Sequence, residues 1–179
     1  MADEDSASKE HMTDFYMLMD LVKAGVDDRT LAILHVSYIE KYLGQAVAAR
    51  LPGLTSRLRE SLFDQEGTLG TLGAKNHMAQ ALGLITPVDH GNISRLSNIR
   101  NKFAHNIAIT SFEHQDILKL LEKLVYDVRL ISGTDEQRKK IVEAWRDSSP
   151  RERFHAIALL LNIALHNFIN AQHRGECDT

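Results

Sequence analysis

The chain has 179 residues, of which 44% are hydrophobic and 25% charged, a balance typical of one folded domain with its own core. Its formal net charge of −3 excludes a general polyanion binder, so any nucleic-acid contact has to come from a local basic surface. A single cysteine, Cys177, excludes an internal disulfide and provides no metal site. The acidic N-terminus is unlike a signal peptide, and no apolar run approaches a membrane span in length. These features predict a cytoplasmic protein without membrane contact.

Apolar residues recur three and four positions apart along nearly the whole chain, which predicts an all-α fold. Residues 1–9 are expected to form a disordered acidic tail, and a first helix is expected over 10–23 with Gly25 ending it. Asp27 is a good N-cap for a second helix that reaches about residue 50, because Pro52 and Gly53 break it. The expected core stripe of that helix is Ala32, Val36, Ile39, Leu43 and Val47.

A short helix capped by Thr55 is expected to end at Phe63. The loop 67–73 has three glycines but lacks the Gly-Lys-Ser/Thr ending of a nucleotide-binding P-loop, so tight backbone packing before a helix over 74–84 is its expected role. The next helix is expected to begin between residues 86 and 92 and to end near 105–106.

The C-terminal third contains three capping-box patterns. They begin at Thr110, Thr134 and Ser149, each with Glu or Gln three positions later. After a short extended segment at 107–109, they predict a helix to about Leu130, a second helix, and a last helix to about His173. The expected organisation is a helical domain over 10–131, a helical hairpin over 132–173 packed on the same domain, and a tail over 174–179.

The nine histidines do not show metal-ligand spacing, and no serine lies in a Gly-x-Ser-x-Gly elbow. His35 and His77 lie in apolar helices, where a lone histidine is more often a hydrogen-bonded core or interface residue than a ligand. The sequence therefore predicts no metal site and no cofactor.

The segment 95–105 is both apolar and basic. Arg95, Arg100, Lys102 and His105 fall within eleven residues that contain no acid. The core face of the same helix is expected to consist of Leu96, Ile99, Phe103 and Ala104. A helix that is half core and half cation, ending in a histidine, is a plausible place to hold a phosphate.

Helix geometry separates the two strongest candidates in this segment. Arg100 and His105 are five positions apart, so they point about 140° away from each other. Geometry alone favours a structural role, in which His105 meets the negative end of the helix dipole and Arg100 bonds near Asn101 or to an acid. Two interpretations of Glu40 stay open. It either pairs locally with Lys41 or Arg50, or is a buried acid that orients Lys75, Arg100 or His105.

The six residues from Arg100 to His105 match the signature of the HEPN superfamily, in which four residues separate Arg from His and a polar Asn follows the Arg. The wider pattern resembles the mannitol-operon-repressor-like branch. Residues 28–43 look like the first long helix of that branch, and 67–85, with Lys75, look like its middle section. The resemblance covers about 27–130, and its parts occur in the family order.

The resemblance implies a HEPN-like helical bundle that forms a homodimer, with the Arg–His helices of two subunits near a shared cleft. In HEPN ribonucleases the ribose 2′-OH attacks the adjacent phosphodiester without a metal. By resemblance His105 would be the acid–base residue, Arg100 would hold the phosphate and Asn101 would support them. Glu40 and Lys75 are further candidates for supporting residues. Arg95 and Lys102 would contact RNA or DNA through the helix over 92–105.

Three functions remain open. The first is a bacterial regulatory protein resembling mannitol operon repressors, acting through a protein partner or a modest nucleic-acid contact. The second is a metal-independent endoribonuclease leaving a 2′,3′-cyclic phosphate, in some contexts a toxin, for which a dimer would supply the second histidine. The third is a non-catalytic helical dimerisation module. Whether the protein is an enzyme is not decided by its sequence.

Overall fold

A computed structural model of the chain describes residues 13, 16–20, 22–127 and 133–173, and all regular structure in these ranges is helical. This confirms the all-α class. The helices are α2 (Asp28–Ala49), α3 (Ser56–Phe63), α4 (Leu72–Ala81), α5 (Pro87–His105), α6 (Gln115–Leu121), α7 (Asp135–Asp147) and α8 (Pro150–His173). Residues 13, 16–20 and 22–23 are also helical, and Gly25 follows them at a positive φ of 74°.

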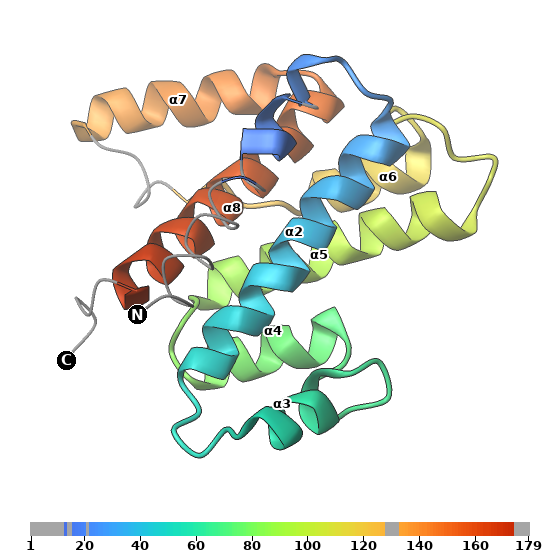
Figure 1. Ribbon diagram of the computed structural model, residues 1–179. Helices are drawn as coiled ribbons and strands as arrows, with labels where there is room; N and C mark the ends of the chain where they lie inside the picture. The colour runs from blue at the N-terminus through green and yellow to red at the C-terminus, as the bar shows by residue number, and fades with distance from the viewer. Residues whose placement is uncertain (1–12, 14–15, 21, 128–132, 174–179) are drawn as a thin grey trace.

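Helix α2 runs through the middle of the bundle and packs against α8, α5 and α4 (Figure 1). The five residues of its predicted core stripe are all at most 1% exposed. Buried residues also lie on its other faces, among them Leu31, Tyr42 and Ala46. A helix covered on several sides has to find partners inside the protein for any polar side chain that it carries.

Side-chain caps set the starts of the N-terminal helices. The carboxylate of Asp27 accepts from Thr30 N at 3.0 Å, and Thr55 accepts from Leu58 N at 3.3 Å, as predicted. Thr71 caps α4, so this helix begins two residues earlier than its apolar pattern indicates. Thr86 and Asp89 form a capping box that begins α5 at Pro87, the earliest start that the sequence allowed.

The prediction of a helix from Thr110 to about Leu130 is wrong at its start. Residues 107–109 form a turn rather than an extended segment, and His114 is the N-cap of α6. The reason is tertiary. Phe112 is 1% exposed, its ring lies 5.1 Å from Phe103 and 4.8 Å from Phe154, and its backbone N–H donates to Asp28 at 2.8 Å. Anchoring Phe112 in the core outweighs the local capping preference of Thr110.

The predicted end of that helix is also wrong where the structure describes it. Helix α6 stops at Leu121, and residues 124–127 are not helical. Asn92, 2% exposed on α5, donates to Val125 O at 2.7 Å and accepts from Val125 N at 3.0 Å. The Asn92 amide thus satisfies both backbone groups of Val125 and ties this non-helical segment to α5.

Helix α8 belongs to the core and is not an appendage. Its buried apolar residues are Phe154, Ile157, Ala158, Leu161, Leu165 and Ile169. Its first turn is tied to α2, because the Arg151 guanidinium pairs with the Asp28 carboxylate and donates to Val26 O at 2.5 Å. Helix α7 has no buried residue and lies at the edge of the molecule (Figure 1).

The apolar length of α8 corrects one expectation from the sequence. Residues 150–171 are long and apolar enough to cross a membrane by length and composition alone, since an 18-residue window within them has a mean hydropathy of 1.4. Core helices of soluble proteins pass the same test, and α8 buries its apolar face against α2. Its role in this fold is therefore that of a core helix.

A buried polar chain joins α2 to α8. His35, fully buried, lies 2.9 Å through Nε2 from His155 Nδ1 and 2.9 Å through Nδ1 from Asn162 Nδ2. An Asn162 N–H that donates to His35 Nδ1 leaves the His35 proton on Nε2, where it donates to His155. Burial, and next the nearby His155, lower the pKa of His35 to about 3. The hydrogen bonds of His35 therefore require its neutral imidazole.

Removing the Asn92 amide should destabilise the fold. Asn92→Ala removes both hydrogen bonds to the Val125 backbone, which should lower the free energy of unfolding by about 1–3 kcal/mol. Asn98→Ala, at an exposed position on the same helix, should change it by less than about 0.5 kcal/mol. Urea denaturation followed by circular dichroism measures both, and equal values for the two variants would contradict the role given to Asn92.

The His35 network should make stability depend on pH. The unfolded chain takes up a proton near pH 6.5 that folded His35 takes up only near pH 3, so stability is complete above pH 6.5 and falls as the pH drops through this window. One such proton contributes a slope of up to about 1.4 kcal/mol per pH unit. His35→Gln should flatten the slope between pH 4 and 6, whereas His105→Gln, at an exposed position, should not. A His35→Gln slope equal to wild type would contradict this assignment.

Candidate functional site

Three helices meet at the carboxylate of Glu40. The Lys75 ammonium of α4 lies 3.2 Å from one Glu40 oxygen, and the Arg100 guanidinium of α5 lies 3.5 Å from the other. The side chains of Glu40 and Arg100 are 28% and 29% exposed and that of Lys75 only 11%. Of the two interpretations of Glu40, the structure shows the cross-helix one. Two cations on one carboxylate leave a net positive charge at this junction.

The loop before α4 sets the position of Lys75. A Cβ on Gly70 would stand 2.2 Å from Asp64 O, and a Cβ on Gly67 would stand 2.5 Å from Leu62 O. Both positions therefore require glycine, in agreement with a backbone-packing role for this loop. Its Gly70 carbonyl accepts from the Lys75 ammonium at 3.3 Å. The loop thus helps to hold a nearly buried lysine beside Glu40.

Arg100 has unused hydrogen-bonding capacity. Its Nε is buried without a hydrogen-bond partner in the described structure, although one terminal nitrogen pairs with Glu40. A guanidinium is a permanent, forked donor that suits an anionic oxygen. The buried Nε is not open to a ligand from solvent, but the side chain is 29% exposed, so its exposed part could take a further acceptor without leaving Glu40.

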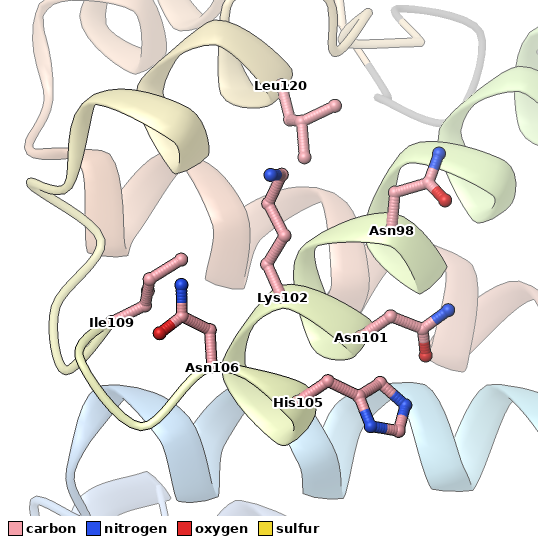
Figure 2. Close-up of a pocket in the computed structure, with 7 residues that line it drawn as sticks. All are labelled: Asn98, Asn101, Lys102, His105, Asn106, Ile109 and Leu120. Atoms are coloured by element: carbon pink, nitrogen blue, oxygen red, sulfur yellow. The ribbon is translucent and has the colours of Figure 1, made fainter.

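His105 lies on a different surface from Arg100. A pocket of about 480 Å³ is lined by Asn98, Asn101, Lys102, His105, Asn106, Ile109 and Leu120 (Figure 2). Arg100 is not among its lining residues. In the figure, Asn101 and His105 extend from the last turns of α5, and Lys102 extends toward Leu120. Within one chain the structure brings His105 together with Asn101 and Lys102, and places Arg100 with Glu40.

The expected phosphate contacts are less available than their sequence indicates. Lys102 lies 3.3 Å from Asp116 of α6, and its hydrogen bond and charge lower the pKa of that carboxyl. Arg95 folds back over Gly91, where a Cβ would stand 2.7 Å from its Nη1. Lys102 and Arg100 both lie beside carboxylates of other helices. The basic face of α5 therefore has fewer unpaired positive charges than the absence of acids from residues 95–105 indicates.

Arg29 is the residue of this site whose role sequence reasoning missed. Its guanidinium donates to the carbonyls of Asn106 and Ile107, each at 3.3 Å, and of Ile109 at 3.0 Å. These carbonyls belong to the C-cap residue of α5 and to the turn that follows it, and Arg29 reaches them from α2. It thereby fixes the turn next to His105. An arginine two positions after the N-cap Asp27 was the only signal, and nothing local shows that it reaches residue 106.

A second polar group lies under the α4–α5 junction. Asn76 donates to His90 O and to Ser94 Oγ, both at 3.0 Å, and the rings of His77 and His90 are 5.0 Å apart. Burial, followed by the charge of His77, lowers the pKa of His90. Asn76 Oδ1 and His90 Nε2 are buried without a partner in the described structure.

Among the described residues, no three His, Cys, Asp or Glu side chains are grouped so that they could hold a metal ion.

Comparison with known proteins shows a similarity of fold. No family model matches this chain, and no curated protein matches it. A chain in the X-ray structure of the MtlR–HPr complex from Escherichia coli superimposes with a TM-score of 0.55, over 88% of this chain and 97% of that one. The two sequences are 17% identical over the match, so the likeness shows a shared fold. The chain therefore has the helical fold found in that complex.

Proposed function

We propose that this protein is a regulator that acts by binding a protein partner, in the manner of mannitol operon repressors. The observation that carries the proposal is the similarity of fold, over nearly the whole length of both chains, to a chain of the MtlR–HPr complex. Fold alone does not decide function, so the residues of this chain have to support the same conclusion.

The charges of the candidate site support a protein partner over a nucleic acid. Glu40 holds Lys75 and Arg100, and Asp116 holds Lys102, so few basic side chains are free for phosphates. The net charge of −3 adds no long-range attraction to a polyanion. Arg95 remains for a modest contact with RNA or DNA. A cytoplasmic location suits such a regulator.

The end of α5 offers a surface for the partner. Ile107 is 86% exposed, an unusual exposure for a large apolar side chain, and the flanking carbonyls are held by Arg29. Asn101, Ala104 and His105, in the last turns of α5 just before it in the chain, are also exposed. An exposed apolar side chain on a turn whose backbone is held in place can serve as an anchor at the centre of a protein interface.

A second candidate function is the metal-independent endoribonuclease. It is favoured by one observation, an open pocket that presents His105 beside Asn101, with an Arg100 that keeps donor capacity nearby on the same helix. Each chain supplies a single such histidine, whereas in-line attack by a 2′-OH uses both a base and an acid. This function therefore requires a homodimer that brings two copies of α5 together.

Binding to HPr tests the first proposal. Isothermal titration with the HPr of the same organism should give a saturable complex, and Ile107→Glu should weaken it at least tenfold, because a charge replaces the buried apolar contact. Leu58→Glu on α3, where the leucine is 44% exposed, is the matched control and should bind like wild type. No measurable heat at about 1 mM HPr would contradict HPr as the partner.

RNA cleavage in the presence of chelator tests the second. If the enzyme exists, His105→Ala and Arg100→Ala should each lose activity by 10²-fold or more, the usual contribution of an acid–base residue, while Arg57→Ala, at an exposed position on α3, retains it. Light scattering at the assay concentration should show a dimer. An inert wild type, or a cleaving monomer, rules this mechanism out. A dimer that neither cleaves RNA nor binds HPr would be the non-catalytic dimerisation module.

A further inference from the structure

A second pocket, apart from the one at His105, lies where α7 and the start of α8 meet the segment after α6. Its volume is about 310 Å³, within the range of sites for small organic molecules. Leu120 of α6 lines the His105 pocket, whereas Leu121 lines this one, so α6 separates them. No residue lines both pockets.

One part of this pocket is aromatic and rigid. The rings of Tyr126 and Trp145 are 5.2 Å apart and inclined at 56°, and the Trp145 indole N–H donates to Arg153 O at 3.2 Å. That hydrogen bond fixes the orientation of the indole. Leu121, Leu124 and Val142 complete an apolar wall beside the two rings. A flat apolar body is the shape that such a wall accepts.

The other part of the pocket is cationic. Arg146 of α7 and Arg153 of α8 both line it, and Glu122 is its one acidic lining residue among those described. Within the described ranges, no carboxylate lies within ion-pair distance of either arginine. Arg153 Nε is moreover buried without a hydrogen-bond partner. A buried donor left unpaired is unfavourable, and an anion in the pocket would satisfy it.

We propose that this pocket binds a small aromatic anion, a planar ring system carrying one carboxylate or phosphate. The ring would lie against Trp145 and Tyr126, and the anionic group would take the donors of Arg146 and Arg153. Carboxylates and phosphates share this recognition, since both offer paired oxygens to a guanidinium. The site uses none of the residues assigned to partner binding or to RNA cleavage, so it stands independently of either function.

The single tryptophan of the chain makes the site directly observable. The indole N–H of Trp145 gives one signal in a ¹H–¹⁵N correlation spectrum of the full chain. The probe is 2-naphthoate, and 2-naphthyl phosphate is the second anionic form. The neutral alcohol 2-naphthalenemethanol tests the ring alone, and acetate tests the anion alone. Naphthoate or the phosphate should move the Trp145 signal saturably, and the two half-probes should bind at least tenfold more weakly.

Arginine variants separate a binding site from simple packing of α7. Arg146→Gln removes an exposed guanidinium and should weaken binding of the naphthyl anion about tenfold, the loss expected of one charge-assisted hydrogen bond. Arg57→Gln, an exposed arginine on α3, is the matched control and should bind like wild type. Arg153→Lys keeps a charge but loses Nε and the planar fork, so it should also weaken binding, with circular dichroism confirming its fold.

Three results would overturn the proposal. The first is an unmoved Trp145 signal with both anions at about 10 mM. The second is equal affinity for the neutral alcohol and for the naphthyl anions, which would show an apolar pocket that does not recognise an anion. The third is unchanged binding in both Arg146→Gln and Arg153→Lys, or an equal loss in Arg57→Gln.

Discussion

Burial of α2 on several sides is the constraint on which the rest of the structure depends. This helix supplies much of the core, yet it carries Asp28, His35 and Glu40 at intervals along its length. Each of these polar side chains is satisfied by a different partner from elsewhere in the fold. Polar groups taken out of water are costly unless they are paired, so these pairings set the register of the surrounding helices against α2.

The partners of α2 join it to different parts of the fold along its length. Near its N-terminus, Asp28 joins Arg151 of α8 to the backbone of Phe112. In the middle, His35 joins α8 through His155 and Asn162. Toward the C-terminus, Glu40 draws in Lys75 and Arg100. The same requirement that stabilises the bundle therefore also decides which way Arg100 points.

This arrangement changes what the Arg100–His105 segment means. On one chain, Arg100 belongs to the Glu40 junction, whereas His105 belongs to the pocket bounded by α5, α6 and the turn that Arg29 holds. A contact with a phosphate that used both residues would have to span these two surfaces, or combine residues from two chains. A protein partner needs no such convergence, since an exposed apolar residue on a rigid turn is sufficient to begin an interface.

The sequence by itself determined the helical class, the central stripe of α2 and the caps at Asp27, Thr55, Thr134 and Ser149, because these are local signals. It also determined that Arg100 and His105 point apart, which follows from helical periodicity alone. Only the tertiary structure decided that Thr110 is not a cap, because burial of Phe112 competes with it. It also decided that α6 ends at Leu121, four residues before Val125, whose backbone pairs with Asn92. Only the structure joined Glu40 to Lys75 and Arg100, and Arg29 to the turn after His105. These contacts link residues 35 to 80 positions apart, and no periodicity or local motif encodes a pairing over that distance.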